Sequence, residues 1–289
     1  MPVSLITWRL LVGRFNGSKF PRHKCFKPHT TSGKNYCSLF IFVLLLLLLD
    51  GDVHPNPGPH NDKDYNFSVA YWNVNSIPVH NFSKISLFSS YNSIYKYDLI
   101  FLSETFLDSS YSLDDARLKL DGYDLVRVDH PNDVKRGGIC AYIKDSLATR
   151  ICNINKLDEC IIIELNISKK KGYIISLYRS PSQSTDEFDE FISNLDQILH
   201  DISSLNPSFM MLLGDFNAKS SSWYSKDTTT PEGFRIESLT SFYSFTQIIS
   251  APTHILPTSS SCIDLIFTDQ PNIIMNSGVH SSLHPNCHH

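Results

Sequence analysis

Short apolar runs alternate with polar segments along most of this chain, which predicts strands and helices that follow one another. Strands are expected where apolar and β-branched residues run together between turn residues. They fall at residues 67–74, 98–103, 139–144, 160–167, 173–178, 209–213 and 263–268. Helical spacing of apolar residues predicts helices at 85–97, 186–203 and 233–245. Strands alternating with helices, together with some hairpins, indicate an α/β sandwich with mixed sheets.

The first part of the chain differs from the rest. Residues 1–38 are basic, show no sustained period and are expected to form a disordered leader. An apolar run rich in leucine follows at 39–49; it is shorter than the roughly 20 residues of a membrane span. Proline, glycine and asparagine crowd residues 50–64, which marks a boundary. The predicted organisation is therefore leader 1–38, leucine run and proline-rich peptide 39–59, linker 60–65 and one domain at 66–289.

Charge and cysteine content narrow the function classes. Seven Lys and Arg residues with no Asp or Glu lie within residues 1–49, which leaves −11 for the remainder of a chain whose net charge is −4. The acidic net charge of this domain argues against nonspecific electrostatic binding of nucleic acid, which depends on Lys and Arg side chains that neutralise phosphates. The seven cysteines are odd in number and show no Cys-x-x-Cys spacing, which indicates reduced thiols in a nuclear or cytoplasmic protein.

Polar residues at the ends of apolar runs are the strongest chemical signal. The strand at 209–213 runs into Gly214, Asp215, Phe216 and Asn217. Other predicted strands end or begin in the same way, at Asn73, Glu104, Tyr178 and Asp264. Such strand ends form the ligand-binding rim of open α/β folds. Acids and amides are the ligands that Mg²⁺ prefers, and a metal beside a phosphate stabilises the charge that develops during its hydrolysis.

Five motifs in order carry a resemblance to a known family. They are WNV (72–74), LSET (102–105), SLYRSPS (176–182), GDFNAKSSSW (214–223) and IDLIFTD (263–269). Together they resemble the endonuclease/exonuclease/phosphatase superfamily, and most closely its branch in LINE-type (non-LTR) retrotransposons. The resemblance covers roughly residues 66–289. It implies a DNase I-like fold, a four-layered α/β sandwich of two mixed β-sheets flanked by helices, truncated at its C-terminal strand. The loss of a central strand would leave unpaired backbone at a sheet edge.

The resemblance also implies roles for individual residues. It assigns metal ligation to Glu104 and Asn73, catalysis to Asp215, Asn217, Tyr178 and Asp264, and substrate binding to Arg179 and Asn217. Glu104 would be the principal ligand of Mg²⁺, with Mn²⁺ as an alternative. Asp215 would act on the attacking water or the leaving oxygen, and Asp264 would orient a catalytic histidine.

Two positions compete for that histidine. His284 stands in Ser-Leu-His, whereas His289 stands in Cys-His-His at a separation from Asp264 closer to that of the family. The spacing favours His289. In either alignment the Asp that precedes the histidine in the family is missing.

A second resemblance lies in the proline-rich peptide. Its sequence, DVHPNPGP at residues 52–59, resembles the 2A-like peptides that make ribosomes skip a peptide bond. It implies separation of the chain between Gly58 and Pro59, although His54 stands where the pattern has Glu. A secretory signal segment is the alternative interpretation of the leucine run.

The expected function is a Mg²⁺-dependent DNA endonuclease of a LINE-type retrotransposon polyprotein. It would nick target DNA and leave a 3′-hydroxyl that primes reverse transcription. The implied partners are DNA and a downstream reverse-transcriptase domain, with no stable membrane partner. Two alternatives stay open. The first is another phosphoesterase of this fold, such as an abasic-site nuclease or an inositol-phosphate or lipid phosphatase. The second is a catalytically decayed copy.

Overall fold

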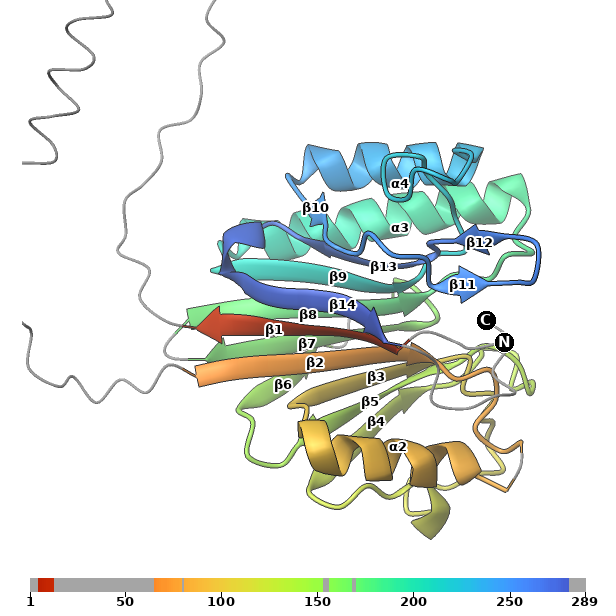
Figure 1. The fold of residues 1–289 in the computed structure, drawn as a ribbon, viewed down its shortest axis with the longest axis vertical. Helices are drawn as coiled ribbons and strands as arrows, with labels where there is room; N and C mark the ends of the chain where they lie inside the picture. Colours follow the sequence, from red (N-terminus) through yellow and green to blue (C-terminus); the bar gives the residue numbers. More distant parts are fainter. Residues whose placement is uncertain (1–4, 13–64, 80, 153–155, 168–169, 281–289) are drawn as a thin grey trace, which may run out of the picture. The chain divides into compact units, whose positions relative to one another are not determined.

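Two six-stranded β-sheets lie face to face in this protein, and helices cover their outer faces (Figure 1). The computed structural model describes residues 5–12, 65–79, 81–152, 156–167 and 170–280. The leucine run and the proline-rich peptide lie outside the described residues, as do both candidate histidines, His284 and His289.

The first sheet has the strand order β14-β1-β2-β3-β5-β4. Its members are β1 (Leu5–Val12), β2 (Tyr65–Asn73), β3 (Leu99–Ser103), β4 (Tyr123–Val128), β5 (Ile139–Lys144) and β14 (Ile274–His280). Strands β2 and β3 run parallel, and the other neighbours are antiparallel.

The second sheet has the strand order β10-β13-β9-β8-β7-β6. Its members are β6 (Thr149–Cys152), β7 (Cys160–Ile167), β8 (Lys170–Tyr178), β9 (Phe209–Asp215), β10 (Thr246–Gln247) and β13 (Asp264–Thr268). Strands β8 and β9 run parallel, and the other neighbours are antiparallel. A separate short hairpin joins β11 (His254–Ile255) to β12 (Ser260–Ser261).

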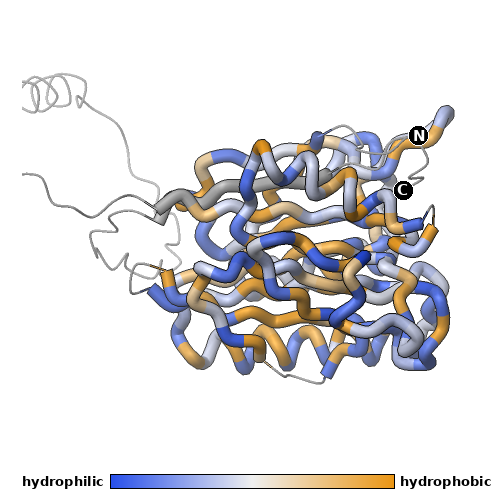
Figure 2. Tube along the Cα trace, turned by 90° about the horizontal axis from the view of Figure 1, so that it is seen from below, coloured by the Kyte–Doolittle hydropathy of each residue, from blue (hydrophilic) through white to orange (hydrophobic). Residues whose placement is uncertain are grey.

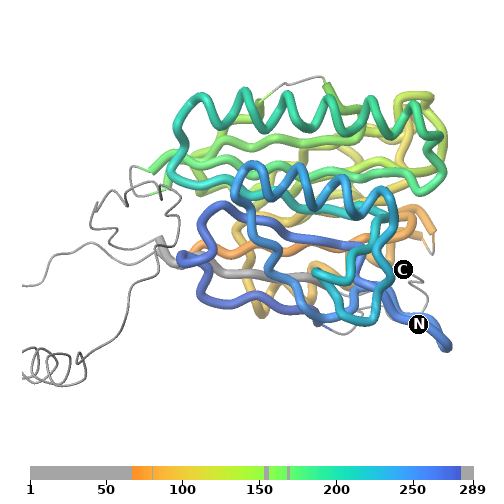
Figure 3. Tube along the Cα trace, turned by 90° about the horizontal axis from the view of Figure 1, so that it is seen from above, coloured from red at the N-terminus to blue at the C-terminus, as the bar shows by residue number. Residues whose placement is uncertain are grey.

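Helices form the two outer layers. Helix α2 (Ser83–Tyr95) covers the first sheet, and α3 (Thr185–Ser204) and α4 (Pro231–Phe242) lie side by side on the second sheet (Figures 1 and 3). Helix α3 begins at a capping box, in which Ser184 and Glu187 satisfy each other's backbone N–H groups. In the described part of the chain, no helix has both the length and the apolar character needed to cross a bilayer.

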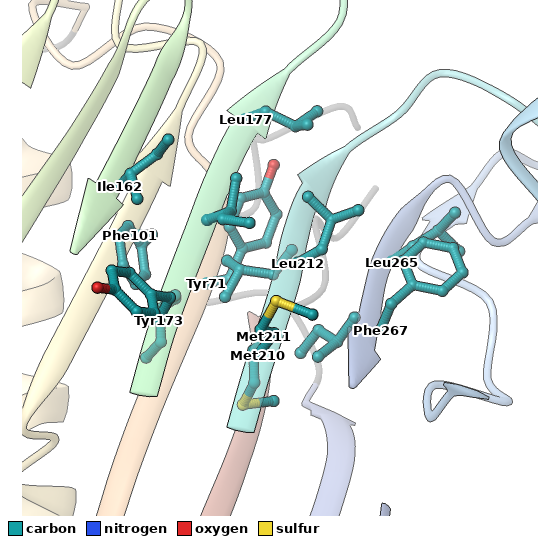
Figure 4. Close-up of a cluster of buried hydrophobic side chains, with 14 of the residues drawn as sticks. Tyr71, Phe101, Ile162, Tyr173, Leu177, Met210, Met211, Leu212, Leu265 and Phe267 are labelled. Atoms are coloured by element: carbon teal, nitrogen blue, oxygen red, sulfur yellow. The ribbon is translucent and has the colours of Figure 1, made fainter. Parts of the chain in front are cut away.

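The core follows from the two-residue period of the strands. In β2, Phe67, Val69 and Tyr71 pack between the sheets, whereas Ala70 and Trp72 pack towards α2. Figure 4 shows Tyr71 and Phe101 of the first sheet facing side chains of β8 and β9. Hydrophobic residues accordingly run along the strands, and hydrophilic ones gather in the turns (Figure 2). The central strands β3, β5 and β9 are buried on both faces, as a four-layered sandwich requires.

Every predicted strand and helix is present, and the predicted fold class is confirmed. The N-terminal segment is different from the prediction. Residues 5–12, expected to be part of a disordered leader, form β1 in the interior of the first sheet. Strand β1 pairs with β2 on one side and with β14 on the other, so the backbone groups of β2 that face it have partners. These partners are distant in the sequence, which is why the local pattern did not reveal the strand.

Candidate active site

The polar strand ends predicted from the sequence meet at one edge of the sandwich. Because β2 and β3 are parallel, Asn73 and Glu104 leave the first sheet at the same end. Because β8 and β9 are parallel, Tyr178 and Asp215 are paired at the end of the second sheet. The antiparallel strand β13 begins there, with Asp264 directly opposite Asp215. Topology therefore places these five residues together.

Asn73 connects the two sheets. Its side-chain nitrogen, Nδ2, donates one hydrogen bond to Oε1 of Glu104 and another to Oδ2 of Asp215, each 3.0 Å long. Its Oδ1 accepts the backbone N–H of Asn75 at 3.0 Å, which fixes the orientation of the amide. Because both accept from the same nitrogen, Oε1 of Glu104 and Oδ2 of Asp215 lie no further apart than twice the 3.0 Å length of each hydrogen bond.

Asp215 is fully buried, and its environment changes its acidity. Burial raises the pKa of Asp215 to about 7, and the negative charge of Glu104 adds to the rise. Hydrogen bonds from the backbone N–H of Asn217 and from Asn73 act in the opposite direction. A cation bound beside the two carboxylates would favour their charged forms.

Two tyrosines lie among the acids. Burial raises the pKa of Tyr178, and so do the nearby Glu104 and Asp215; its hydroxyl also forms a side-chain hydrogen bond with Glu104. Burial raises the pKa of Tyr71, and the negative charges of Asp264 and Asp215 raise it further. Both tyrosines are therefore protonated at neutral pH and available as hydrogen-bond donors.

The side chain of Thr253 fixes the backbone of Asp264. Its N–H donates to Oγ1 of the buried Thr253 at 3.0 Å, and the N–H of Ile263 donates to the same oxygen at 3.1 Å. Sequence reasoning missed Thr253, since a single threonine in a loop carries no pattern. The histidine that Asp264 was predicted to orient lies outside the described residues.

Arg179, which was predicted to bind substrate, contacts the backbone of the protein. Its side chain is buried, and its guanidinium donates hydrogen bonds to the backbone carbonyls of Phe216, Asn217 and Ser180. In return, Nδ2 of Asn217 donates to the carbonyl of Arg179 at 2.8 Å. Arg179 therefore holds the loop after β9 in place, and its contact with substrate stays a prediction.

The donor set fits a hard cation held partly by water. Glu104 and Asp215 offer carboxylate oxygens, and Asn73 offers an amide, which is the chemistry that suits Mg²⁺. Among the described residues, no group of three or more His, Cys, Asp or Glu side chains is arranged to hold a metal. Mg²⁺ usually keeps several waters, so a cation at this site would complete its shell with water or phosphate.

Comparisons with known proteins give a family profile for part of the chain and a fold for most of it. Residues 172–288, which include Tyr178, Asp215 and Asp264, match the family profile described as Endonuclease-reverse transcriptase. No curated protein matches the chain by sequence.

Three solved structures share the fold. The endonuclease domain of TRAS1, a telomere-specific non-LTR retrotransposon, is 12% identical with a TM-score of 0.55, and the match covers 69% of this chain and 82% of that one. The AP endonuclease LMAP from Leishmania major is 15% identical with a TM-score of 0.58, covering 69% and 78%. The Xenopus laevis APE2 catalytic domain is 13% identical with a TM-score of 0.53, covering 76% and 94%. At these identities the likeness establishes the fold, which is one that nucleases use.

Proposed function

We propose that this chain is a Mg²⁺-dependent DNA endonuclease of a LINE-type retrotransposon polyprotein, which nicks target DNA to provide a 3′-hydroxyl primer. The observation that carries the proposal is the pair of acids, Glu104 and Asp215, that share the amide of Asn73 beside the hydroxyl of Tyr178. The match of residues 172–288 to the Endonuclease-reverse transcriptase family supports it.

Each residue of the site has a task in the proposed reaction. Glu104 and Asn73 would hold the Mg²⁺ ion, with Mn²⁺ as an alternative. When bound, the ion would stabilise negative charge on the phosphoryl oxygens. Asp215 would accept a proton from the attacking water, because its carboxylate lies beside Asn73, which with Glu104 would hold the ion. Tyr178 would donate a hydrogen bond to the phosphate.

The bond that breaks is the one between phosphorus and the O3′ atom of the preceding nucleotide. Water adds its oxygen to phosphorus, and the departing O3′ takes up a proton, which leaves a 3′-hydroxyl and a 5′-phosphate. We assign delivery of that proton to a histidine oriented by Asp264, either His289 or His284. Asn217 would help to position the phosphate through its side-chain oxygen, since its Nδ2 is already bonded to Arg179.

The test uses the full chain with supercoiled plasmid and Mg²⁺. We expect conversion to open circles, and loss of that conversion in Asp215→Ala. Asp269→Ala is the matched control, because Asp269 is also an acid that accepts a backbone N–H, but at the opposite end of β9. If neither the wild-type chain nor the control nicks the plasmid, the endonuclease proposal fails.

A second candidate is a phosphoesterase with another substrate, and the fold likeness to an AP endonuclease favours the abasic-site form. A duplex with one abasic site and a free inositol phosphate, assayed beside the plasmid, separate these alternatives. Cleavage confined to the abasic duplex would identify a repair nuclease. Phosphate release from the inositol phosphate would identify a phosphatase. A folded chain that is inert on all three substrates would be a decayed copy.

We also propose that residues 52–59 act as a 2A-like peptide and that the finished protein works with DNA and a downstream reverse-transcriptase domain in the nucleus or cytoplasm. In-vitro translation should then yield two products separated at Gly58 and Pro59. The first product would carry β1 and would have to pair with β2 and β14 as a separate chain. A variant with Pro59→Ala should yield one. A single full-length product from the wild-type chain would refute skipping.

A further inference from the structure

Glu104 lies on the middle one of three loops that run side by side beyond the end of the first sheet. The outer loops are residues 74–77, after β2, and residues 137–138, before β5. On one side, Ser76 N–H donates to the carbonyl of Glu104 at 2.7 Å. On the other side, Thr105 N–H donates to the carbonyl of Gly138 at 3.2 Å. The pairing of the sheet thus continues into the loops that surround the acid.

The middle loop has a conformation that its own residues do not favour. Glu104 has a φ angle of 51° and Phe106 one of 56°, and neither is glycine. Left-handed backbone of this kind is uncommon for residues with a side chain, and it persists where the surroundings determine it. The direction of the Glu104 carboxylate therefore depends on the two outer loops.

A buried lysine fixes the first outer loop. Lys84, near the start of α2, is 2% exposed, and its Nζ donates to the carbonyls of Val74 and Asn75 at 2.6 Å and of Ser76 at 3.0 Å. A buried ammonium group is tolerated only where hydrogen bonds replace its water. Three consecutive carbonyls bent around one ammonium set the curvature of this loop, which follows directly after Asn73.

A half-buried acid fixes the second outer loop. The Glu159 carboxylate accepts the backbone N–H of Gly138, and it lies so close to Gly137 that a Cβ there would overlap it. The carbonyl of Glu159 also accepts the backbone N–H of Tyr178 at 3.0 Å. Partial burial raises the pKa of Glu159 to about 7, and the hydrogen bond from the Gly138 N–H acts in the opposite direction. Glu159 therefore connects Tyr178 in the second sheet to the loops around Glu104 in the first.

We propose that Lys84 and Glu159 are positioning residues that hold the Glu104 loop from its two sides and so set the affinity of the site for a divalent cation. The inference rests on the proposed function only in that Glu104 ligates the cation. Neither residue is assigned a part in the chemical step. Both act through backbone groups, and their effect reaches the cation through the direction of the Glu104 side chain.

The test measures Mn²⁺ binding directly, by electron paramagnetic resonance of free Mn²⁺ added to the full chain. Removal of a residue that orients a metal ligand lowers metal affinity about 10- to 100-fold, and we expect this loss for Lys84→Met and for Glu159→Ala. Glu159→Gln keeps an oxygen that accepts the Gly138 N–H, so it should restore most of the affinity. Lys84→Gln retains two donors and covers the case in which Lys84→Met does not fold.

The controls are Lys144→Met and Asp269→Ala. Lys144 pairs with Asp98, and Asp269 accepts the N–H of Met210, both at the far ends of their strands. Both should lower the melting temperature while leaving Mn²⁺ affinity unchanged. Wild-type affinity in Lys84→Met and Glu159→Ala would overturn the inference, as would equal losses in the controls.

The measurement also separates the inference from the proposed function. A wild-type chain that binds Mn²⁺ but does not nick DNA would remove the endonuclease proposal and leave the role of Lys84 and Glu159 to be decided by the variants. A wild-type chain that does not bind Mn²⁺ would overturn the inference itself.

Discussion

Glu104 and Asp215 come from different sheets, yet both accept a hydrogen bond from the same nitrogen atom, Nδ2 of Asn73. Two buried acids that share one donor repel each other, and the raised pKa of Asp215 is a consequence of this arrangement as well as of burial. The negative charges of the two carboxylates thus repel each other in the cation-free site, and a bound cation would offset this repulsion. Proteins commonly give up stability in this way where function requires it.

Replacement of Asp215 by Asn should stabilise the protein in a pH-dependent manner. The pKa of Asp215 is about 7 in the folded protein and 3.8 in the reference state. Because the pKa of Asp215 is raised in the folded protein, folding favours the protonated carboxyl. The contribution of this group to the free energy of unfolding of the wild type is therefore fully present below about pH 4 and is lost as the pH rises through 7. Asp215→Asn should therefore gain roughly 2 kcal/mol in the free energy of unfolding at pH 8, and nothing at pH 4.

Urea unfolding at both pH values measures this gain. The figure is below that of the full pKa shift, because the new amide group would place a donor against Asn73. Added Mg²⁺ should stabilise the wild-type chain more than the variant and so narrow the difference at pH 8. An equal gain at pH 4 and pH 8 would mean that the charge of Asp215 is not its cause.

Gly214 is required immediately before the acid. Its φ angle is 150°, and a Cβ at this position would lie 1.9 Å from the carbonyl oxygen of Leu177 on the neighbouring strand. Gly214→Ala should lower the free energy of unfolding by more than about 3 kcal/mol, because β8 and β9 would have to separate. Gly278→Ala is the control, since a Cβ at Gly278 meets nothing within 4 Å. Similar thermal melts for the two variants would contradict this prediction.

Arg179→Ala should damage the fold around the site more than substrate affinity. The buried guanidinium is bonded to the carbonyls of Phe216 and Asn217, and these would lose their donors. We expect a loss of about 3 kcal/mol in the free energy of unfolding. Arg150→Ala should cost less than about 1 kcal/mol, because Arg150 is largely exposed and its buried partner Glu164 keeps Lys171 and Tyr173 as partners. A stable Arg179→Ala variant with only weakened DNA binding would contradict this structural role and support the predicted contact with substrate.

Tyr178→Phe should lower nicking without lowering stability. The hydroxyl lies among Glu104, Asp215 and Glu159, whose charges, added to burial, raise the pKa of Tyr178 and keep it a donor at neutral pH. Removal of one such donor from a charged transition state costs about 100-fold in kcat. The same loss should be seen at pH 6 and pH 9, since the phenol does not ionise in that range. Thermal melts within a degree or two of the wild type would exclude misfolding as the cause.

The positions of the five strand-end residues could be predicted because their cause is local. An apolar run that ends in Asp215 or Glu104 shows both the strand and its end in consecutive letters. Parallel pairing of β2 with β3 and of β8 with β9 then places these strand ends at the same edge. Lys84 and Glu159 could not be predicted, because a single charge beside an apolar run is usually solvated. Their contacts are with the backbone of loops, which no pattern of residue types shows.

Arg179 illustrates a different difficulty. Its position beside Tyr178 at a strand end suggested a contact with phosphate, and arginine is well suited to phosphate. The loop after β9 turns back at Asn217, whose φ angle is 45°, and presents its carbonyls to the guanidinium. The residue type was therefore informative about a strong polar contact but not about the partner in it.

The place of β1 between β2 and β14 has a consequence for the order of assembly. Strands β2 and β3 can pair while the chain is still short, but β1 acquires its second neighbour only when β14, near the far end of the described chain, is available. Contacts between remote segments form slowly because a long loop must close first. During synthesis on the ribosome, the completed first sheet, and with it the rigid support for Asn73 and Glu104, should therefore be among the last features to mature.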